Sequence, residues 1–130
     1  MKIEHLEANL IKYEAGSAVT TRDMQELAAA LDKRLTNRET FGLLMARSGE
    51  PAKNPEASRW WNEWLKQNKQ LLKTYCAGVA MVTDSDRLFK LYKLLAGTMI
   101  SRMFGCAGSM FASEPEAVVW LRERLAESGQ

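Results

Sequence analysis

The sequence predicts an α/β fold in which an N-terminal β-hairpin and a following βαβαβα succession form one mixed sheet of four to five strands, flanked by four helices. Two observations lead to this prediction. Residues 77–82 form a short, uncharged apolar run, which is typical of a strand covered on both faces. After a polar turn at residues 83–86, apolar side chains recur at helical spacing as far as Met103. A buried strand joined to a helix is half of a βαβ unit, and such units require a parallel sheet.

The chain begins with two predicted strands. Residues 3–6 and 10–14 are β-prone and are separated by a turn-like segment, so we expect a hairpin. Thr20 then caps a helix, with Asp23 three residues later. The apolar positions of this helix share one face, as expected for packing on a sheet: Met24, Leu27, Ala28, Leu31 and Leu35.

The remaining elements alternate between strand and helix. Residues 41–46 read as a second buried strand. Asn54 and Pro55 signal the next helix start, because asparagine caps a first turn and the missing N–H of proline costs nothing there. Residues 109–112 predict a last short strand, and Ser113 caps the final helix with an acid at its third position.

Length and charge restrict the class of protein. We expect residues 1–130 to form a single domain, because 130 residues is the length of one domain. The net charge of +2 is too small to draw the chain strongly to nucleic acid. Between Arg59 and Arg102 there are eight Lys and Arg against three acids, so the basic charge gathers on the middle helices. No aromatic side chains alternate with these charges, and we do not expect nucleic-acid binding.

Neither export nor membrane insertion is expected. The first five residues lack the apolar core of a signal peptide. There is no apolar run of about 18 residues, the length that reads as a transmembrane helix. We therefore expect a cytoplasmic protein of bacterial type, without a transmembrane segment.

No catalytic, metal or cofactor motif stands out, so we expect a protein that is not an enzyme and carries no cofactor. His5 is the only histidine and lies in the predicted hairpin, which excludes a Ser-His-Asp triad on geometry. Asp84 and Asp86 follow the buried strand, where they either cap a helix or hold a cation. Cys76 and Cys106 both precede strands, so parallel pairing places them at the same end of the sheet, as buried small hydrophobes or as a redox pair.

Three tryptophans, Trp60, Trp61 and Trp64, are the most unusual feature of the chain. Helical spacing places Trp60 and Trp64 on one face and turns Trp61 roughly 100° away. They either pack in the core or line an apolar ligand pocket, in which Met99, Met103 and Met110 would supply adaptable walls.

The basic helices offer a second candidate surface. Lys90 and Lys93 lie on one side of the predicted third helix. An amphipathic basic helix can lie on an acidic membrane surface or face a partner, whereas lysines on an outer face also serve solubility.

Three segments carry a resemblance to a known family: residues 19–24 (VTTRDM), residues 77–84 (AGVAMVTD) and residues 110–121 (MFASEPEAVVWL). In order and spacing they resemble the SpoIIAA-like group, which is related to STAS domains and to the lipid-binding Sec14 domain. The resemblance covers residues 3–126 and implies the fold predicted above. In the members of this group that are switched by phosphorylation, the serine concerned directly follows an aspartate. Here Ser48 follows Arg47, so no phosphorylation site is transferred.

These observations lead to two expectations of function. The first is a non-enzymatic binding or interaction domain of SpoIIAA-like type, which acts through protein–protein contacts or an apolar ligand pocket and forms a homodimer. The alternative is a lipid-carrying or membrane-surface module that uses the basic, Trp-rich middle helices.

Overall fold

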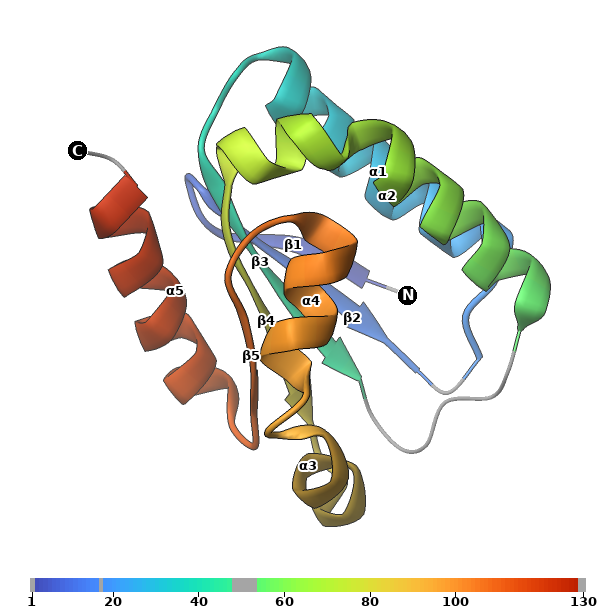
Figure 1. Ribbon diagram of the computed structural model, residues 1–130, viewed down its shortest axis with the longest axis vertical. Helices are drawn as coiled ribbons and strands as arrows, with labels where there is room; N and C mark the ends of the chain where they lie inside the picture. Colours follow the sequence, from blue (N-terminus) through green and yellow to red (C-terminus); the bar gives the residue numbers. More distant parts are fainter. Residues whose placement is uncertain (1, 17, 48–53, 129–130) are drawn as a thin grey trace.

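The structure, a computed structural model, describes residues 2–16, 18–47 and 54–128 and contains one five-stranded sheet (Figure 1). In the sheet the strands follow their order in the chain: β1 (Lys2–Glu7), β2 (Leu10–Ala15), β3 (Phe41–Arg47), β4 (Cys76–Thr83) and β5 (Gly108–Phe111). Strand β1 pairs antiparallel with β2 across a two-residue turn, and every later pair is parallel. The predicted hairpin and mixed sheet are confirmed.

The helices lie on both faces of the sheet (Figure 1). They are α1 (Thr21–Thr36), α2 (Pro55–Tyr75), α3 (Asp86–Tyr92), α4 (Ala96–Phe104) and α5 (Glu114–Ser128). Right-handed crossovers that advance along a sheet in one direction place their helices on the same face. Helices α1, α2 and α4 accordingly share one face, and α5 covers the other.

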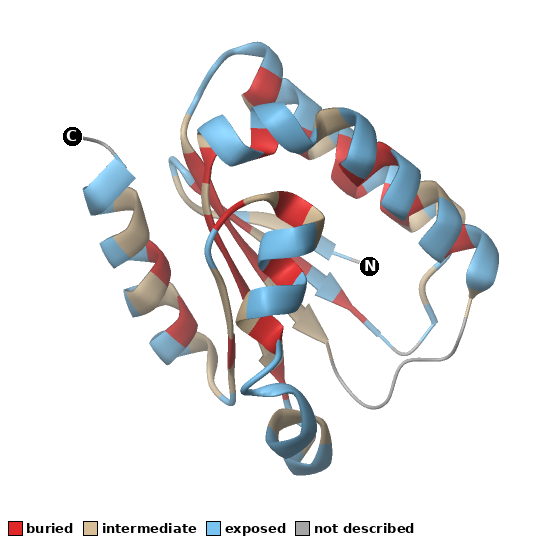
Figure 2. Cartoon of the chain, in the orientation of Figure 1, coloured by how far each residue is buried: buried red, intermediate tan, exposed pale blue. Residues whose placement is uncertain are grey.

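Each face of the sheet has its own core, seen as red segments on the facing elements in Figure 2. The larger core joins alternate residues of the strands to α1, α2 and α4, and includes the fully buried Phe41, Leu72 and Phe104. The smaller core packs Leu10 and Leu44 under Leu121 of α5. Because both faces are covered, the central strands β3 and β4 read as apolar runs in the sequence.

The helix starts form as the sequence predicts. Thr20 and Asp23 make a complete capping box, and the Asn54 side chain accepts a hydrogen bond from the N–H of Ala57 at 3.1 Å. The Ser113 hydroxyl accepts from the N–H of Glu116 at 3.4 Å at the start of α5. These caps fix where each crossover ends and each helix begins.

The single long helix predicted after β4 is wrong, since the chain forms α3 and α4 instead, and the described residues contain five helices rather than four. Between them the N–H of Leu95 donates to the carbonyl of Tyr92, a tightened i to i+3 turn. Helix α4 lies directly on β5: a Cβ at Gly108 would be 2.3 Å from Cγ2 of Ile100. The break lets α4 take this direction, which differs from that of α3 (Figure 1).

Within the described residues, no helix has both the length and the apolar character needed to cross a membrane. In the same residues, no group of three or more His, Cys, Asp or Glu side chains is placed to hold a metal ion.

Candidate functional site

An apolar cavity of about 330 Å³ lies between α4 and the carboxyl ends of the parallel strands. This is the edge at which α/β sheets commonly bind ligands. The volume falls near the lower end of the range for small-molecule sites, about 300–1,000 Å³. We call it the sheet-edge cavity; its described lining is Tyr13, Met45, Ala46, Arg47, Met81, Val82, Thr83, Leu88, Tyr92, Ala96, Met99, Ile100, Met103 and Met110.

The strand register builds the floor of this cavity. Tyr13 pairs with Met45, Met45 with Met81, and Met81 with Met110, so one row of side chains crosses four parallel strands. Two residues further along, on the same face, Arg47 of β3 pairs with Thr83 of β4. The floor therefore has a deep row of one tyrosine and three methionines, with a polar row at the sheet edge.

The two short helices form the wall. Leu88 and Tyr92 come from α3, and the remaining wall residues come from α4: Ala96, Met99, Ile100 and Met103. Met99 is 47% exposed and Tyr92 is 39% exposed, whereas Ile100 is buried. Methionine side chains adapt to ligands of varied shape. The wall therefore has a packed base and a solvent-facing mouth.

A second cavity, of about 490 Å³, adjoins the first. It lies where α1 and α2 begin, and Val19, Asn54 and Trp61 are among its lining residues. The two cavities share four lining residues: Met45, Arg47, Met81 and Met103. Arg47 is the one charged side chain among the described residues that line either cavity.

The polar groups of the sheet-edge cavity are few. The Tyr13 side chain is 1% exposed, and its hydroxyl has no hydrogen-bond partner among the described residues. Burial raises the pKa of Tyr13 to about 12; the carboxylate of Asp23 adds to this rise, and the guanidinium of Arg47 opposes it. The Thr83 hydroxyl already accepts the N–H of Ser85 at 3.2 Å.

The stacked tryptophan pair differs from the pair that the helical spacing placed on one face, Trp60 and Trp64. Trp61 and Trp64 are the stacked pair, with ring centroids 5.2 Å apart and planes 8° apart, whereas Trp60 is only half-buried. Trp61 is turned roughly 100° from Trp60 as expected, but positions three apart also share a helix face, so Trp61 rather than Trp60 stacks on Trp64. Trp61 lines the second cavity, while Trp60 and Trp64 line neither.

Of the predicted pocket residues, the structure brings Met99, Met103 and Met110 together in the sheet-edge cavity, and Met103 also lines the second cavity with Trp61. Lys90 is exposed on α3. Lys93 is not a free surface lysine: its ammonium donates to the carbonyl of Met110 at 2.6 Å and lies 4.8 Å from the ring centroid of Phe111. Lys93 therefore holds the α3–α4 turn against β5.

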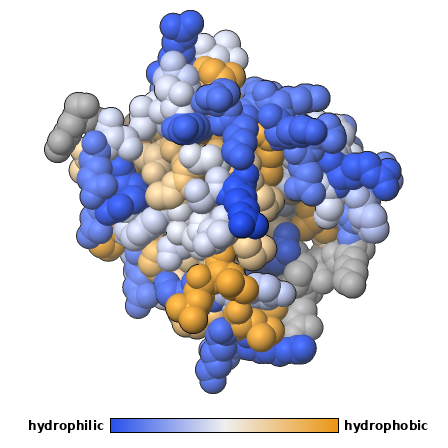
Figure 3. Space-filling model, viewed as in Figure 1, coloured by the Kyte–Doolittle hydropathy of each residue, from blue (hydrophilic) through white to orange (hydrophobic). Residues whose placement is uncertain are grey.

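The α3–α4 turn carries an exposed apolar patch. Leu94 is 92% exposed, and Leu91 and Leu95 are each 55% exposed. In Figure 3 hydrophobic surface gathers at this end of the molecule, bordered by hydrophilic side chains. We call Leu91, Leu94 and Leu95 the leucine patch; it lies next to Tyr92 and Met99 at the mouth of the cavity.

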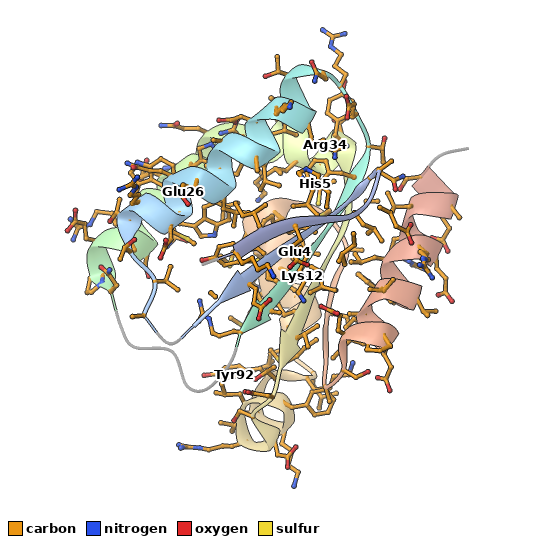
Figure 4. All side chains as sticks on the ribbon, turned by 180° about the vertical axis from the view of Figure 1, so that it is seen from behind. Glu4, His5, Lys12, Glu26, Arg34 and Tyr92 are labelled. Atoms are coloured by element: carbon orange, nitrogen blue, oxygen red, sulfur yellow. The ribbon has the colours of Figure 1, made fainter. Side chains whose placement is uncertain are left out.

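Other candidates lie away from the cavity. His5 lies towards the end of the molecule opposite Tyr92 (Figure 4). Lys12, also labelled in Figure 4, points to the other face of β2 from Tyr13 and pairs with Glu114 of α5. Asp84 follows β4, and the cap of α3 is Ser85, whose hydroxyl accepts the N–H of Leu88 at 3.2 Å. Ser48 lies outside the described residues.

The two cysteines meet, as their positions before parallel strands predict. Both are buried and free, and the Cys76 thiol donates to the carbonyl of Gly78 at 3.6 Å. The contact with Cys106, together with burial, raises the pKa of the Cys76 thiol.

Comparison with known proteins identifies the family. The family model described as SpoIIAA-like matches residues 10–122, which is most of the chain. The chain belongs to the SpoIIAA-like family. No curated protein matches it. The crystal structure of an uncharacterized protein from the DUF3478 family, with a SpoIIAA-like fold, from Shewanella loihica PV-4, superposes with a TM-score of 0.68 at 15% identity. The match covers 92% of this chain and 90% of that one, and at this identity it shows a shared fold.

Within this SpoIIAA-like chain, sequence reasoning missed the floor of the cavity. Tyr13, Met45, Arg47 and Met81 lie on three different strands, and only the register brings them together. The one available signal was a methionine in each of two apolar runs, together with an arginine that ends the first run.

Proposed function

We propose that this chain is a non-catalytic binding module that holds a small apolar ligand in the sheet-edge cavity. The observation that supports the proposal is a methionine-rich cavity of about 330 Å³ at the carboxyl edge of the sheet. Its one charged lining residue, Arg47, has no histidine or carboxylate beside it among the described lining residues. Such a lining suits binding and offers no general base.

The test is binding of a neutral apolar dye, Nile red, to the purified protein. Met99→Trp places an indole at the mouth of the cavity from a position that is 47% exposed, so the variant should fold. We expect Met99→Trp to weaken dye binding roughly tenfold, the effect of losing about 1.4 kcal/mol of contact. Leu71→Trp is the matched control, because Leu71 is 44% exposed on α2 and lines neither cavity. If the parent, Met99→Trp and Leu71→Trp bind the dye equally, or if the parent does not bind it at all, the proposal is contradicted. Organic extraction and mass spectrometry of the purified protein test for a retained ligand.

A second function is favoured by the leucine patch: docking on an anionic membrane surface, from which an apolar ligand could reach the cavity mouth. Three exposed leucines beside an exposed Lys90 combine apolar area with positive charge, the pairing that interfacial helices use. A contiguous exposed apolar patch of this kind is a common mark of an interaction surface.

Vesicle sedimentation tests this second function. We expect binding to vesicles that contain phosphatidylglycerol, and loss of that binding in Leu94→Asp and in Lys90→Glu. Val119→Asp is the control, because Val119 is 53% exposed on α5, on the other face. The expected homodimer is the competing occupant of the patch. If light scattering gives a mass near twice 14.7 kDa, and Leu94→Asp reduces this mass to that of the monomer, the leucine patch binds a second copy of the chain instead.

A further inference from the structure

The Tyr13 hydroxyl is the most unusual polar atom in the larger core. It is buried on β2, beside the Met45 position in the floor of the sheet-edge cavity, and has no hydrogen-bond partner among the described residues. Buried hydroxyls are normally paired, because leaving one unpaired costs about 1–3 kcal/mol. A phenylalanine would fill the same space without that cost. The hydroxyl is therefore placed where a ligand can supply the partner.

Arg47 adds a positive charge to the lining of the same cavity. It follows Met45 by two residues on the neighbouring strand, so both side chains leave the same face of the sheet. It lines both cavities at the point where they meet. Its guanidinium is near enough to Tyr13 to lower the pKa of the phenol against the opposing effect of burial. A planar guanidinium has only donors and fits a carboxylate or a phosphate in two-point contact.

The residues around Tyr13 and Arg47 favour a ligand group with one negative charge over a group with two. The rest of the described lining is apolar apart from Thr83, whose hydroxyl accepts a backbone N–H, and Tyr92 at the mouth. Asp23 lies close enough to Tyr13 to raise the pKa of the phenol, and its carboxylate accepts the N–H of Thr20 at 3.0 Å. Arg47 is the one cation in the described lining and balances one negative charge, so the second charge of a phosphate would be left unpaired in a largely apolar cavity near Asp23.

We propose that the sheet-edge cavity selects an apolar acid, whose carboxylate accepts a hydrogen bond from Tyr13 and pairs with Arg47 while its hydrocarbon body lies on Met45, Met81 and Met103. The inference rests on the proposed function and specifies the ligand class of the same cavity. The methionine side chains form an apolar surface that adapts to the ligand, and the two donors, Tyr13 and Arg47, fix the orientation of the ligand.

Calorimetric titration with four probes of equal chain length tests this assignment: octanoate, octanol, octylammonium and octyl phosphate. We expect octanoate to bind roughly tenfold tighter than octanol, as a charge-assisted hydrogen bond predicts. Octylammonium and octyl phosphate should bind more weakly than octanoate. Tyr13→Phe and Arg47→Gln should each lower the affinity for octanoate roughly tenfold and leave that for octanol unchanged.

Matched controls separate the site from general effects. Tyr75→Phe removes a phenol hydroxyl from α2, and Arg102→Gln removes a positive charge from the exposed side of α4; neither residue lines a cavity. Both should bind octanoate as the parent protein does. Equal affinity for octanoate and octanol, or a preference for octyl phosphate or octylammonium, overturns the acid assignment and leaves the apolar module intact. If none of the four probes binds and Nile red does not bind either, both the acid assignment and the proposed apolar binding module are overturned.

Discussion

Tyr13 gives the fold a dependence on alkaline pH that can be measured without a ligand. Its pKa is raised to about 12 by burial, above the value of about 10 for an exposed tyrosine. The folded protein therefore holds the phenolic proton more tightly than the unfolded chain does. The contribution of Tyr13 to stability is complete below pH 10 and is lost as the pH rises from 10 towards 12.

Comparison of the parent protein with Tyr13→Phe tests this dependence. At pH 7 the variant should be as stable as the parent, or more stable by about 1 kcal/mol, because an unpaired buried hydroxyl is removed. In urea unfolding the parent should lose more stability than the variant between pH 10 and 12. Lys12, whose pKa is also raised, titrates in both proteins, so the difference between them isolates Tyr13. Difference absorbance between the parent and Tyr13→Phe should show the Tyr13 phenol ionising near pH 12; ionisation of this phenol near pH 10 would contradict the burial effect.

At the scale of elements, the contact between α4 and β5 depends on one missing side chain. A Cβ at Gly108 would be 2.3 Å from Cγ2 and 2.4 Å from Cβ of Ile100. These atoms lie near the backbone of α4 and cannot swing aside as the end of a long side chain can. Gly108→Ala must therefore push α4 away from the sheet and widen the sheet-edge cavity.

We expect Gly108→Ala to destabilise the protein by about 1–3 kcal/mol or more, the cost of overpacking a core. Gly16→Ala is the control, because a Cβ there meets no atom within 4 Å. That variant should be neutral or slightly stabilised, since alanine restricts the unfolded chain more than glycine does. Urea unfolding measures both. Equal stability of the two variants would show that α4 does not lie as close to β5 as described.

This contact also marks where sequence reasoning stopped. Caps at Thr20, Asn54 and Ser113 depend on side chains within three residues, so the sequence was sufficient to predict them. The break between α3 and α4 could not be predicted in the same way, because the apolar spacing continues through it. What ends the helix is the approach of α4 to β5 and the bond from Lys93 to the carbonyl of Met110, both of them tertiary contacts.

At the scale of the whole molecule, connectivity was the most informative part of the sequence. Each helix between two strands requires a parallel crossover, and this determined the mixed sheet and its two covered faces. The candidate site was predicted only in part: Met99, Met103 and Met110 were identified, but Tyr13 and Arg47 were not. Helical positions follow a local period, whereas the row from Tyr13 to Met110 exists only once four strands have paired in register.

The buried cysteines report on the integrity of this whole assembly. Cys76 begins β4 and Cys106 follows α4, and both lie in the larger core, 4% and 9% exposed. The neighbouring Cys106 thiol, and burial, raise the pKa of Cys76 and keep its thiol protonated and unreactive. A thiol reagent should reach either sulfur only after α4 and β4 have separated.

We therefore expect a disulfide reagent such as Ellman's to label the native protein slowly at pH 8, with both thiols reacting at one rate, and to label the urea-unfolded chain at once. When opening and closing are fast relative to labelling, the rate follows the population of the open form. Gly108→Ala should then be labelled faster than the parent by the factor that its loss of stability predicts, about tenfold for each 1.4 kcal/mol. Gly16→Ala should match the parent. Fast labelling of one thiol in the native protein, unaffected by Gly108→Ala, would contradict a core closed around both cysteines and would favour an accessible redox pair.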